Sequence, residues 1–219
     1  MARISVEEAR KSAQKPVTTE RKNTNWLKLP NDGDTARVRF LLKNIDGLQC
    51  EYVHMLAVEG KNKTITLAHE CLDKGNGEEC PICQAGYQRT VKVYVPLLIN
   101  NEIFIWSRGA MYINEIQTLF MTYEELYKYE FDLIRSGKSG DMGTIYRVNY
   151  YPACKQVEWD SLPDPTEALN NVVIKKPFED YVYFAENGKF KPYASSAKEE
   201  ETTTQQSGFK ALKKRAEEY

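Results

Sequence analysis

Histidine and cysteine are scarce in this sequence: its 219 residues include two histidines and five cysteines. With so few histidines, little remains for general acid–base chemistry near neutral pH, and we expect no enzymatic activity. The sequence also lacks a run of about 18 consecutive apolar residues, so we expect no membrane-spanning helix and no membrane partner. The opening segment MARISVEEARKSAQKP has no apolar core like that of a signal peptide. We therefore expect a cytoplasmic protein, and in that reducing compartment clustered cysteines favour metal ligation over disulfide bonds.

Alternation of apolar and polar residues predicts several short strands. In residues 35–42, Arg37 and Arg39 alternate with apolar side chains. Two further β-rich runs flank an Asn-Asn dipeptide that suits a hairpin turn. Helical spacing of apolar residues is found over 111–129, and residues 156–193 are punctuated by proline and predicted to be irregular. Strands are also predicted in 48–58, 63–68, 90–99, 102–109 and at both ends of 131–151.

Many short strands with one or two helices predict a mainly β protein with some α structure. The expected architecture is a five-stranded β-barrel of the oligonucleotide-binding (OB-fold) type with an inserted zinc-binding loop. Polar composition predicts an N-terminal arm and a flexible C-terminal tail on either side of this core. The predicted divisions are an arm at 1–24, a core at 25–193 with a zinc subdomain at about 50–90, and a tail at 194–219.

Three of the five cysteines lie within thirteen positions, in the stretch CLDKGNGEECPIC. Cys80 and Cys83 form a CxxC knuckle, a spacing that lets both sulfurs reach one ion at the zinc–sulfur distance of about 2.3 Å. Cys71 lies upstream across a glycine-containing loop that permits a tight return. Buried or free thiols are the alternative, but a third cysteine and nearby histidines favour one structural zinc ion.

The fourth ligand has three candidates in the sequence. His54 lies at the end of a predicted strand, which would hold its ring on a rigid element, and it is the favoured choice. His69 is only two positions from Cys71, a spacing that is less usual for a zinc site. Cys50 is the third candidate. A site of three cysteines and one histidine with no open position would be structural and not catalytic.

Aromatic and cationic side chains gather on the predicted 90–109 hairpin. Branched aliphatic residues make the better core, so the aromatic and basic residues are expected on the opposite, solvent-facing side as one patch. Unpaired bases stack on aromatic rings with about 1–3 kcal/mol per base, and cations follow the phosphates. The alternative is a second packing layer beneath residues 112–129. The candidate DNA-binding residues are Arg37, Arg39, Lys92, Tyr94, Phe104, Trp106, Arg108, Tyr146 and Arg147.

Four runs of the sequence together resemble the zinc-containing single-stranded DNA-binding proteins of tailed phages, the family of the T-even helix-destabilising protein. These runs are NWLKLPNDGDTARVRFLL, YVHMLAV, CLDKGNGEECPICQAG and FDLIRSGKSGDMGTIYRV. The resemblance covers roughly residues 25–152. Its most specific part is the ordered set of one histidine and three cysteines, which maps onto His54, Cys71, Cys80 and Cys83.

The resemblance implies an OB-fold barrel, structural zinc, no catalysis, and cooperative coating of single-stranded DNA during phage replication, recombination and repair in the cytoplasm of the host bacterium. In such proteins a basic N-terminal arm mediates self-association, and an acidic C-terminal tail recruits replication proteins. The tail of this chain departs from that pattern, because residues 194–219 contain five acidic and five basic side chains.

Two other functions fit parts of the sequence. A zinc-ribbon module that contacts a protein of a phage replication or packaging machine would show no salt-dependent affinity for single strands. A metal-dependent nuclease would need a carboxylate array, and residues such as Asp132 and Asp141 form no recognisable one.

Overall fold

The computed structural model describes residues 24–59, 64–73, 75, 79–138 and 143–191. Nearly all of the predicted arm and the whole predicted tail lie outside these residues, as does Asp141. In the described part the chain forms seven strands and less helix, which confirms the prediction of a mainly β protein. The strands are β1 (Thr35–Phe40), β2 (Gln49–Glu59), β3 (Thr64–Glu70), β4 (Thr90–Ile99), β5 (Glu102–Gly109), β6 (Glu130–Ser136) and β7 (Ile145–Tyr151). The helices are α2 (Pro81–Gln84), α3 (Tyr112–Tyr123), α4 (Thr166–Asn170) and α5 (Phe178–Asn187), with 3-10 turns η1 (Ile45–Gly47), η2 (Leu126–Lys128) and η3 (Trp159–Ser161).

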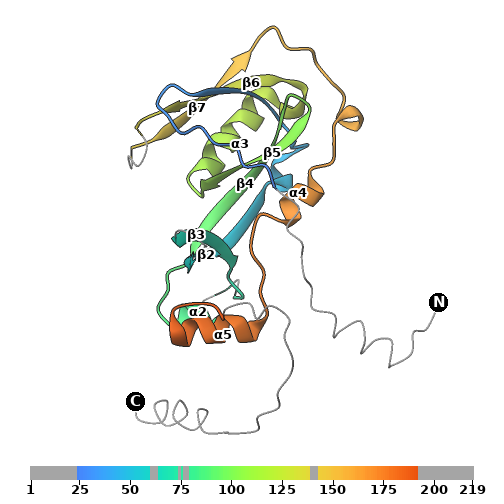
Figure 1. Cartoon of the computed structure of the whole chain (residues 1–219). Coiled ribbons are helices and arrows are strands. Elements are labelled where there is room, and N and C mark those ends of the chain that lie inside the picture. The colour runs from blue at the N-terminus through green and yellow to red at the C-terminus, as the bar shows by residue number, and fades with distance from the viewer. Residues whose placement is uncertain (1–23, 60–63, 74, 76–78, 139–142, 192–219) are drawn as a thin grey trace, which may run out of the picture.

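All seven strands belong to one sheet with antiparallel pairings, and β4 is its central strand. The order is β3-β2-β4-β1-β6-β7, while β5 pairs with β4 (Figure 1). Among the described residues no hydrogen-bonded pair of strands closes the sheet. Each of the seven strands coincides with a run for which the sequence predicted a strand, but the sheet is open among the described residues, so the predicted five-stranded barrel is not confirmed. Strands β2 and β3 come from the segment that was assigned to the zinc subdomain.

The main core lies between one face of the sheet and α3. Side chains alternate along a strand, so every second residue of β1, β4 and β6 contributes to this face. Helix α3 covers it with Tyr112 and Ile116. The buried strand residues of this core are Val38, Phe40, Val93, Val95, Leu97, Trp106, Phe131 and Leu133. The core therefore fixes β4 and β5, the two strands that carry most of the predicted DNA-binding residues.

A smaller lobe projects from the sheet and consists of the β2–β3 hairpin, α2 and α5, which lie together at one end of the molecule (Figure 1). We call it the metal lobe. Helix α5 packs Tyr181 and Phe184 against Leu56 and Ile82, which belong to β2 and α2. The prediction that residues 156–193 are irregular is wrong here. The spacing of Tyr181 and Phe184 puts both rings on one helical face, and that face is buried against a segment about a hundred residues earlier in the chain.

None of the helices in the described residues has the length and the apolar character needed to cross a lipid bilayer.

Candidate metal centre and nucleic-acid face

The structure brings together the four residues that the sequence predicted as metal ligands. The ligand atoms of His54, Cys71, Cys80 and Cys83 all lie within 4.8 Å of one another. The Cys71 and Cys83 sulfurs are 3.7 Å apart, and His54 Nε2 lies 3.5 Å from the Cys80 sulfur and 3.4 Å from that of Cys83. A tetrahedral zinc ion with bonds of about 2.0–2.3 Å separates its ligand atoms by about 3.4–3.8 Å. The four residues are therefore spaced to hold one such ion.

Each ligand comes from a different point of the metal lobe. His54 lies in β2, Cys71 directly follows β3, Cys80 precedes α2, and Cys83 lies within that helix. His54, Cys71 and Cys80 are buried and Cys83 is partly so. Pro81 at the first position of α2 starts the helix, because its fixed φ suits that position and it needs no hydrogen-bond acceptor.

The two alternative ligands lie outside the cluster. His69 is opposite His54 in the β2–β3 pair and is buried, but its ring stacks on Phe190 with centroids 4.8 Å apart. Cys50 is an exposed residue of β2. Neither belongs to the group of residues whose ligand atoms converge.

The ring of His54 is oriented for ligation by its second nitrogen. Nδ1 lies 3.2 Å from the carbonyl oxygen of Gln88, which accepts a hydrogen bond when Nδ1 carries the proton. Nε2 is then the unprotonated nitrogen and faces the sulfurs, an arrangement common among metal-bound histidines. Burial lowers the pKa of His54, so the ring is kept neutral, as a metal ligand must be.

The three thiols perturb one another. Burial by itself would raise the pKa of Cys80, but amide groups of Cys83, Leu72 and Ile82 lower it below the ordinary value. Burial, the Cys71 thiol and negative charge on its neighbours raise the pKa of Cys83 to about 12. Three thiolates this close together need a compensating cation, and a divalent metal ion supplies it.

Two residues that the sequence analysis did not single out organise the loop between Cys71 and the knuckle. The buried carboxylate of Asp73 accepts hydrogen bonds from the amides of Gly75 at 2.5 Å and Glu79 at 3.0 Å. Arg89 donates to the carbonyl oxygens of Asp73 and Gly75, and its guanidinium lies 4.6 Å from the centre of the Tyr52 ring. Asp73 lies two residues after Cys71, and Arg89 lies six residues after Cys83. Neither spacing is a recognisable motif in the sequence, so the two roles are seen only in the folded structure.

The predicted single patch on the hairpin is wrong, because the strand register divides its members between two faces. Directly paired residues share a face, and Trp106 pairs with Val95 while Tyr94 pairs with Ser107. Trp106 therefore lies on the core face and Tyr94 on the opposite face. A difference of one residue in register moves a side chain to the other face, and the sequence does not specify that offset.

Both faces of the hairpin are covered at these positions. Tyr94 and Trp106 are each 1% exposed. Trp106 belongs to the main core, and Tyr94 packs under Val172 and Val173, which follow α4. The alternative of a second packing layer is thus correct for these two rings, although the layer over Tyr94 comes from residues 172–173 and not from 112–129. Phe104 is half-buried opposite Leu97.

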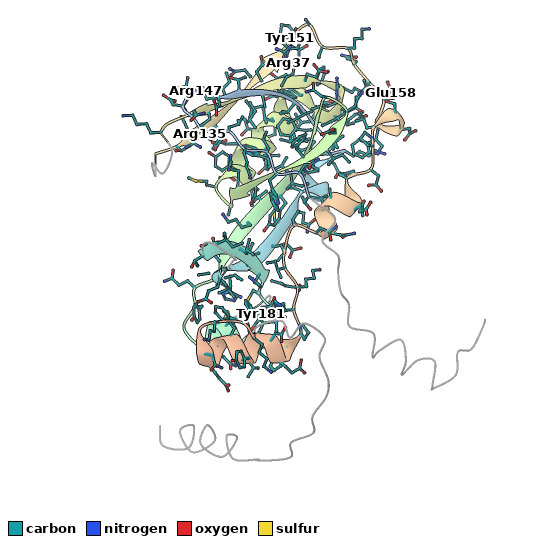
Figure 2. The ribbon with its side chains drawn as sticks, in the orientation of Figure 1. Arg37, Arg135, Arg147, Tyr151, Glu158 and Tyr181 are labelled. Carbon is teal, nitrogen blue, oxygen red and sulfur yellow. The ribbon has the colours of Figure 1, made fainter. Side chains whose placement is uncertain are left out.

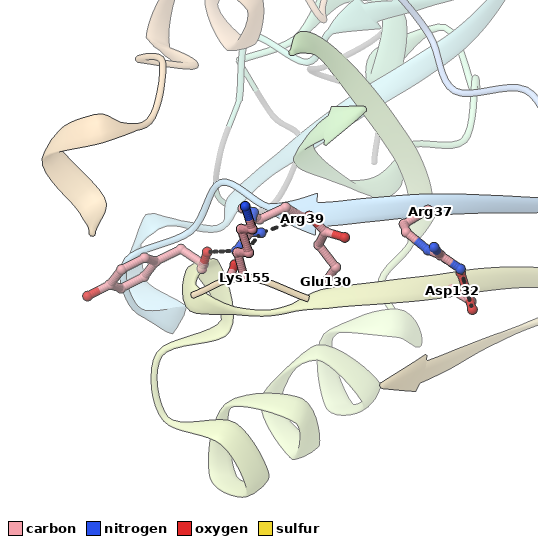
Figure 3. A network of polar contacts seen from close by, with 6 residues as sticks. Arg37, Arg39, Glu130, Asp132 and Lys155 are labelled. Carbon is pink, nitrogen blue, oxygen red and sulfur yellow. Dashed lines mark hydrogen bonds and ion pairs between the residues drawn. The ribbon is translucent and has the colours of Figure 1, made fainter. Parts of the chain in front are cut away.

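The two arginines of β1 have different environments (Figure 3). Arg39 is 5% exposed and donates to Glu130 at 2.9 Å and to the carbonyl oxygens of Tyr127 and Lys155 at 2.9 and 3.0 Å. It is a structural residue, and its assignment to an exposed binding face is not supported. The side chain of Arg37 is 47% exposed and is paired with Asp132 at 3.1 Å.

Arg108 and Tyr146 are the predicted residues that the structure gathers at one place, whereas Lys92, which pairs with Gly109, lies with Tyr94 on the other face of the sheet. The Arg108 guanidinium carbon lies 3.7 Å from the centre of the Tyr146 ring and 4.9 Å from that of Trp106. Burial lowers the pKa of Arg108, and burial together with the charge of Arg108 lowers that of Lys92. Among the described residues, neither cation forms an ion pair with a carboxylate. We call Lys92 and Arg108 the cation pair, although their side chains leave neighbouring positions of the β4–β5 ladder on opposite faces.

The remaining predicted residue, Arg147, is exposed on β7, at the same end of the molecule as Arg37 and Tyr151 (Figure 2). In the register of β6 with β7 it pairs with Ile134, on the face opposite to that of Tyr146. The predicted DNA-binding residues therefore lie in three environments, which are the core, the cation pair and the outer face of β1, β6 and β7.

Comparison with protein-family models, with curated proteins and with solved structures finds no match to this chain.

Proposed function

We propose that this protein binds single-stranded DNA without sequence specificity and that one zinc ion, held by His54 and three cysteines, stabilises its fold. The observation that carries the proposal is the position of Arg108 beside the rings of Tyr112 and Tyr146. This partly buried cation forms no ion pair with a carboxylate among the described residues, and an anionic ligand would offset the cost of its burial. The phosphates of a nucleic acid are such a ligand.

The surroundings of Arg108 also suit a single strand. Arg108 donates Nη1 to the carbonyl oxygen of Ser107 at 2.8 Å, and its buried Nε has no hydrogen-bond partner in the described part of the chain. The guanidinium is therefore held in place while a donor stays available for an acceptor such as a phosphate oxygen. The buried ring of Tyr112 and the half-buried ring of Tyr146 border the same site with centroids 6.2 Å apart. Rings and cations together are the features that sequence-independent single-strand sites use.

The strand order supports an OB-like barrel as the scaffold. Five of the strands follow the path β7-β6-β1-β4-β5, with α3 between β5 and β6 in the chain. This is the order of a five-stranded Greek-key barrel of the oligonucleotide-binding type, which is often only partly closed. Side chains bridge the open ends, because Trp106 and Arg108 of β5 contact Tyr146 of β7, the two rings being 5.6 Å apart. The proposed binding site lies at this seam.

Zinc would act as a structural ion. Four protein ligands leave no open coordination position for a substrate or a water molecule. The ion would join β2 to the segment that leads into β4, because Gln88, which fixes the His54 ring, is two residues before β4 begins. Strand β2 also pairs with β4 from Thr90 to Tyr94, which includes Lys92. Metal binding would thus support the strand that carries one cation of the pair.

Titration of the zinc-loaded full chain with fluorescent oligonucleotides tests this function. We expect oligo-dT and a mixed-sequence single strand to bind with similar affinity, and a duplex of the same length to bind more weakly. The logarithm of the affinity should fall linearly with the logarithm of the salt concentration, by about 0.7 for each phosphate contacted. An absence of salt-dependent affinity would reject DNA binding and favour the protein-interaction module.

A further inference from the structure

A second site lies on the opposite face of β1 from the main core. It is a groove with a volume of about 730 Å³ between β1, the β4–β5 turn and the segment from Lys155 to Pro163. Small-molecule sites in proteins commonly have volumes of about 300–1,000 Å³. We call it the β1 groove. It shares no residue with the cation pair or the metal centre.

The floor of the β1 groove is fixed by the buried arginine of β1 (Figure 3). Arg39 binds the side chain of Glu130, so the only carboxylate among the described residues that line the groove is already neutralised. The Arg39 guanidinium also donates hydrogen bonds to the carbonyl oxygens of Tyr127 and Lys155. A ring contact between Trp159 and Tyr127, with centroids 5.3 Å apart, holds the far wall. The groove is therefore a built feature of the fold.

The rim of the β1 groove is basic. Arg37 lies against the Tyr151 ring, 3.3 Å from its centre, and is oriented by Asp132, while nearly half of its side chain remains exposed. Lys155 is exposed, and only its main-chain carbonyl takes part in the Arg39 network. The acidic residues of the same wall segment, Glu158 and Asp160, do not line the groove. The groove thus carries more positive than negative charge.

The other walls combine amide groups with apolar surface. Asn100 and Asn101 form the β4–β5 turn with φ of 50° and 65°, a left-handed conformation that asparagine tolerates well. Their amide side chains both donate and accept hydrogen bonds. Leu98, Leu162 and Pro163 supply apolar surface beside them. Apolar walls, amide groups and a basic rim match a ligand with a flat base, polar base edges and a phosphate.

We propose that the β1 groove binds a nucleoside phosphate, with the base against Leu162 and Pro163 and the phosphate between Arg37 and Lys155. The source of the ligand is either a nucleotide of a bound single strand that continues from the cation pair or a free nucleotide. The first source rests on the proposed function, and the second does not.

Two variants of the full-length, zinc-loaded protein test the proposal. Lys155→Glu reverses the charge at the rim without touching the main-chain carbonyl that Arg39 binds. Asn101→Gly removes an amide and keeps the turn, because glycine adopts positive φ freely. Lys175→Glu, at an exposed lysine that does not line the groove, is the matched charge control. Affinities are measured for oligo-dT of about 5 and about 15 nucleotides, which span the usual range of sites on one OB fold, and for thymidine monophosphate.

If the groove binds a nucleotide of the strand, both groove variants weaken binding of the longer oligonucleotide, roughly tenfold for Lys155→Glu, and leave the shorter one nearly unchanged. If it binds a free nucleotide, the variants weaken only the binding of thymidine monophosphate. The proposal is overturned if the variants match Lys175→Glu for all three ligands. Failure of the unaltered protein to bind either oligonucleotide would reject the proposed function alone, and the thymidine monophosphate measurement would still decide the groove.

Discussion

Removal of the metal ion should unfold α2 and α5 of the metal lobe while the main sheet stays folded. The lobe has a small apolar core, and its four large side chains, Leu56, Ile82, Tyr181 and Phe184, are each buried. Burial of such side chains contributes about 1.5–3 kcal/mol apiece, or about 6–12 kcal/mol together. The main sheet has its own, larger core and does not depend on these contacts.

The cost of ordering the lobe exceeds that gain. The four residues of α2 and the ten of α5 lose conformational freedom at about 1.5 kcal/mol each, roughly 20 kcal/mol in all. The deficit of about 8–14 kcal/mol is close to the binding free energy of a structural zinc ion, about 10–16 kcal/mol. We therefore expect the fold of α2 and α5 to depend on the metal.

Hydrogen exchange measured before and after chelation checks this prediction, with metal content verified independently. We expect amides of α5 to lose protection and those of β6 and β7 to keep it, and we expect affinity for oligo-dT to fall roughly tenfold, because β2 supports β4 beside Lys92. Cys80→Ser should reproduce the effect, and Cys50→Ser, at the exposed cysteine outside the cluster, should not. Full protection of α5 in verified metal-free protein would refute the reasoning.

Three further predictions concern stability. Arg39→Ala should lower the free energy of unfolding by about 3–5 kcal/mol, because it leaves Glu130 and two carbonyl groups without their donor; Arg37→Ala should have little effect, and equal shifts in urea denaturation would contradict the assigned roles. Phe184→Ala should cost about 3–5 kcal/mol and release zinc to a colorimetric chelator at a lower temperature, since the ring is buried in the metal lobe; unchanged zinc release would count against that packing. Burial lowers the pKa of His54 in the folded protein, so the folded state binds fewer protons than the unfolded chain. The stability that this ring contributes is complete above its ordinary value of 6.5 and is lost as pH falls through its lowered value in the folded protein; melting temperatures that stay constant between about pH 7.5 and 5.5 would contradict this assignment.

The metal ligands could be predicted from the sequence because the chemistry depends on local spacing. Two residues separate Cys80 from Cys83, and this spacing alone lets both sulfurs reach one ion. His54 was identified through its place at a strand, and the structure puts its Nε2 next to the sulfurs. The mainly β fold followed from alternation, which is also a local property.

The faces of the hairpin and the helix α5 could not be predicted because they depend on distant parts of the chain. The alternation of residues 90–109 does not say which side chains of the two strands share a face. The pairing of Trp106 with Val95 places the Trp106 ring on the core face. Tyr94 is covered by Val172 and Val173, about eighty residues later in the sequence. Helix α5 is stabilised by packing against β2 and α2, and its short apolar stripe is only a weak indication of a helix in the sequence.

The salt dependence of oligo-dT binding by Arg108→Gln tests the proposed function at the residue that carries it. With thermal denaturation confirming an intact fold, we expect the slope of log affinity against log salt to become shallower by about 0.7, the value for one lost phosphate contact on a single strand. Lys189→Gln, at an exposed lysine beyond α5, should leave the slope unchanged. A folded Arg108→Gln variant with the slope and affinity of the unaltered protein would contradict the proposal.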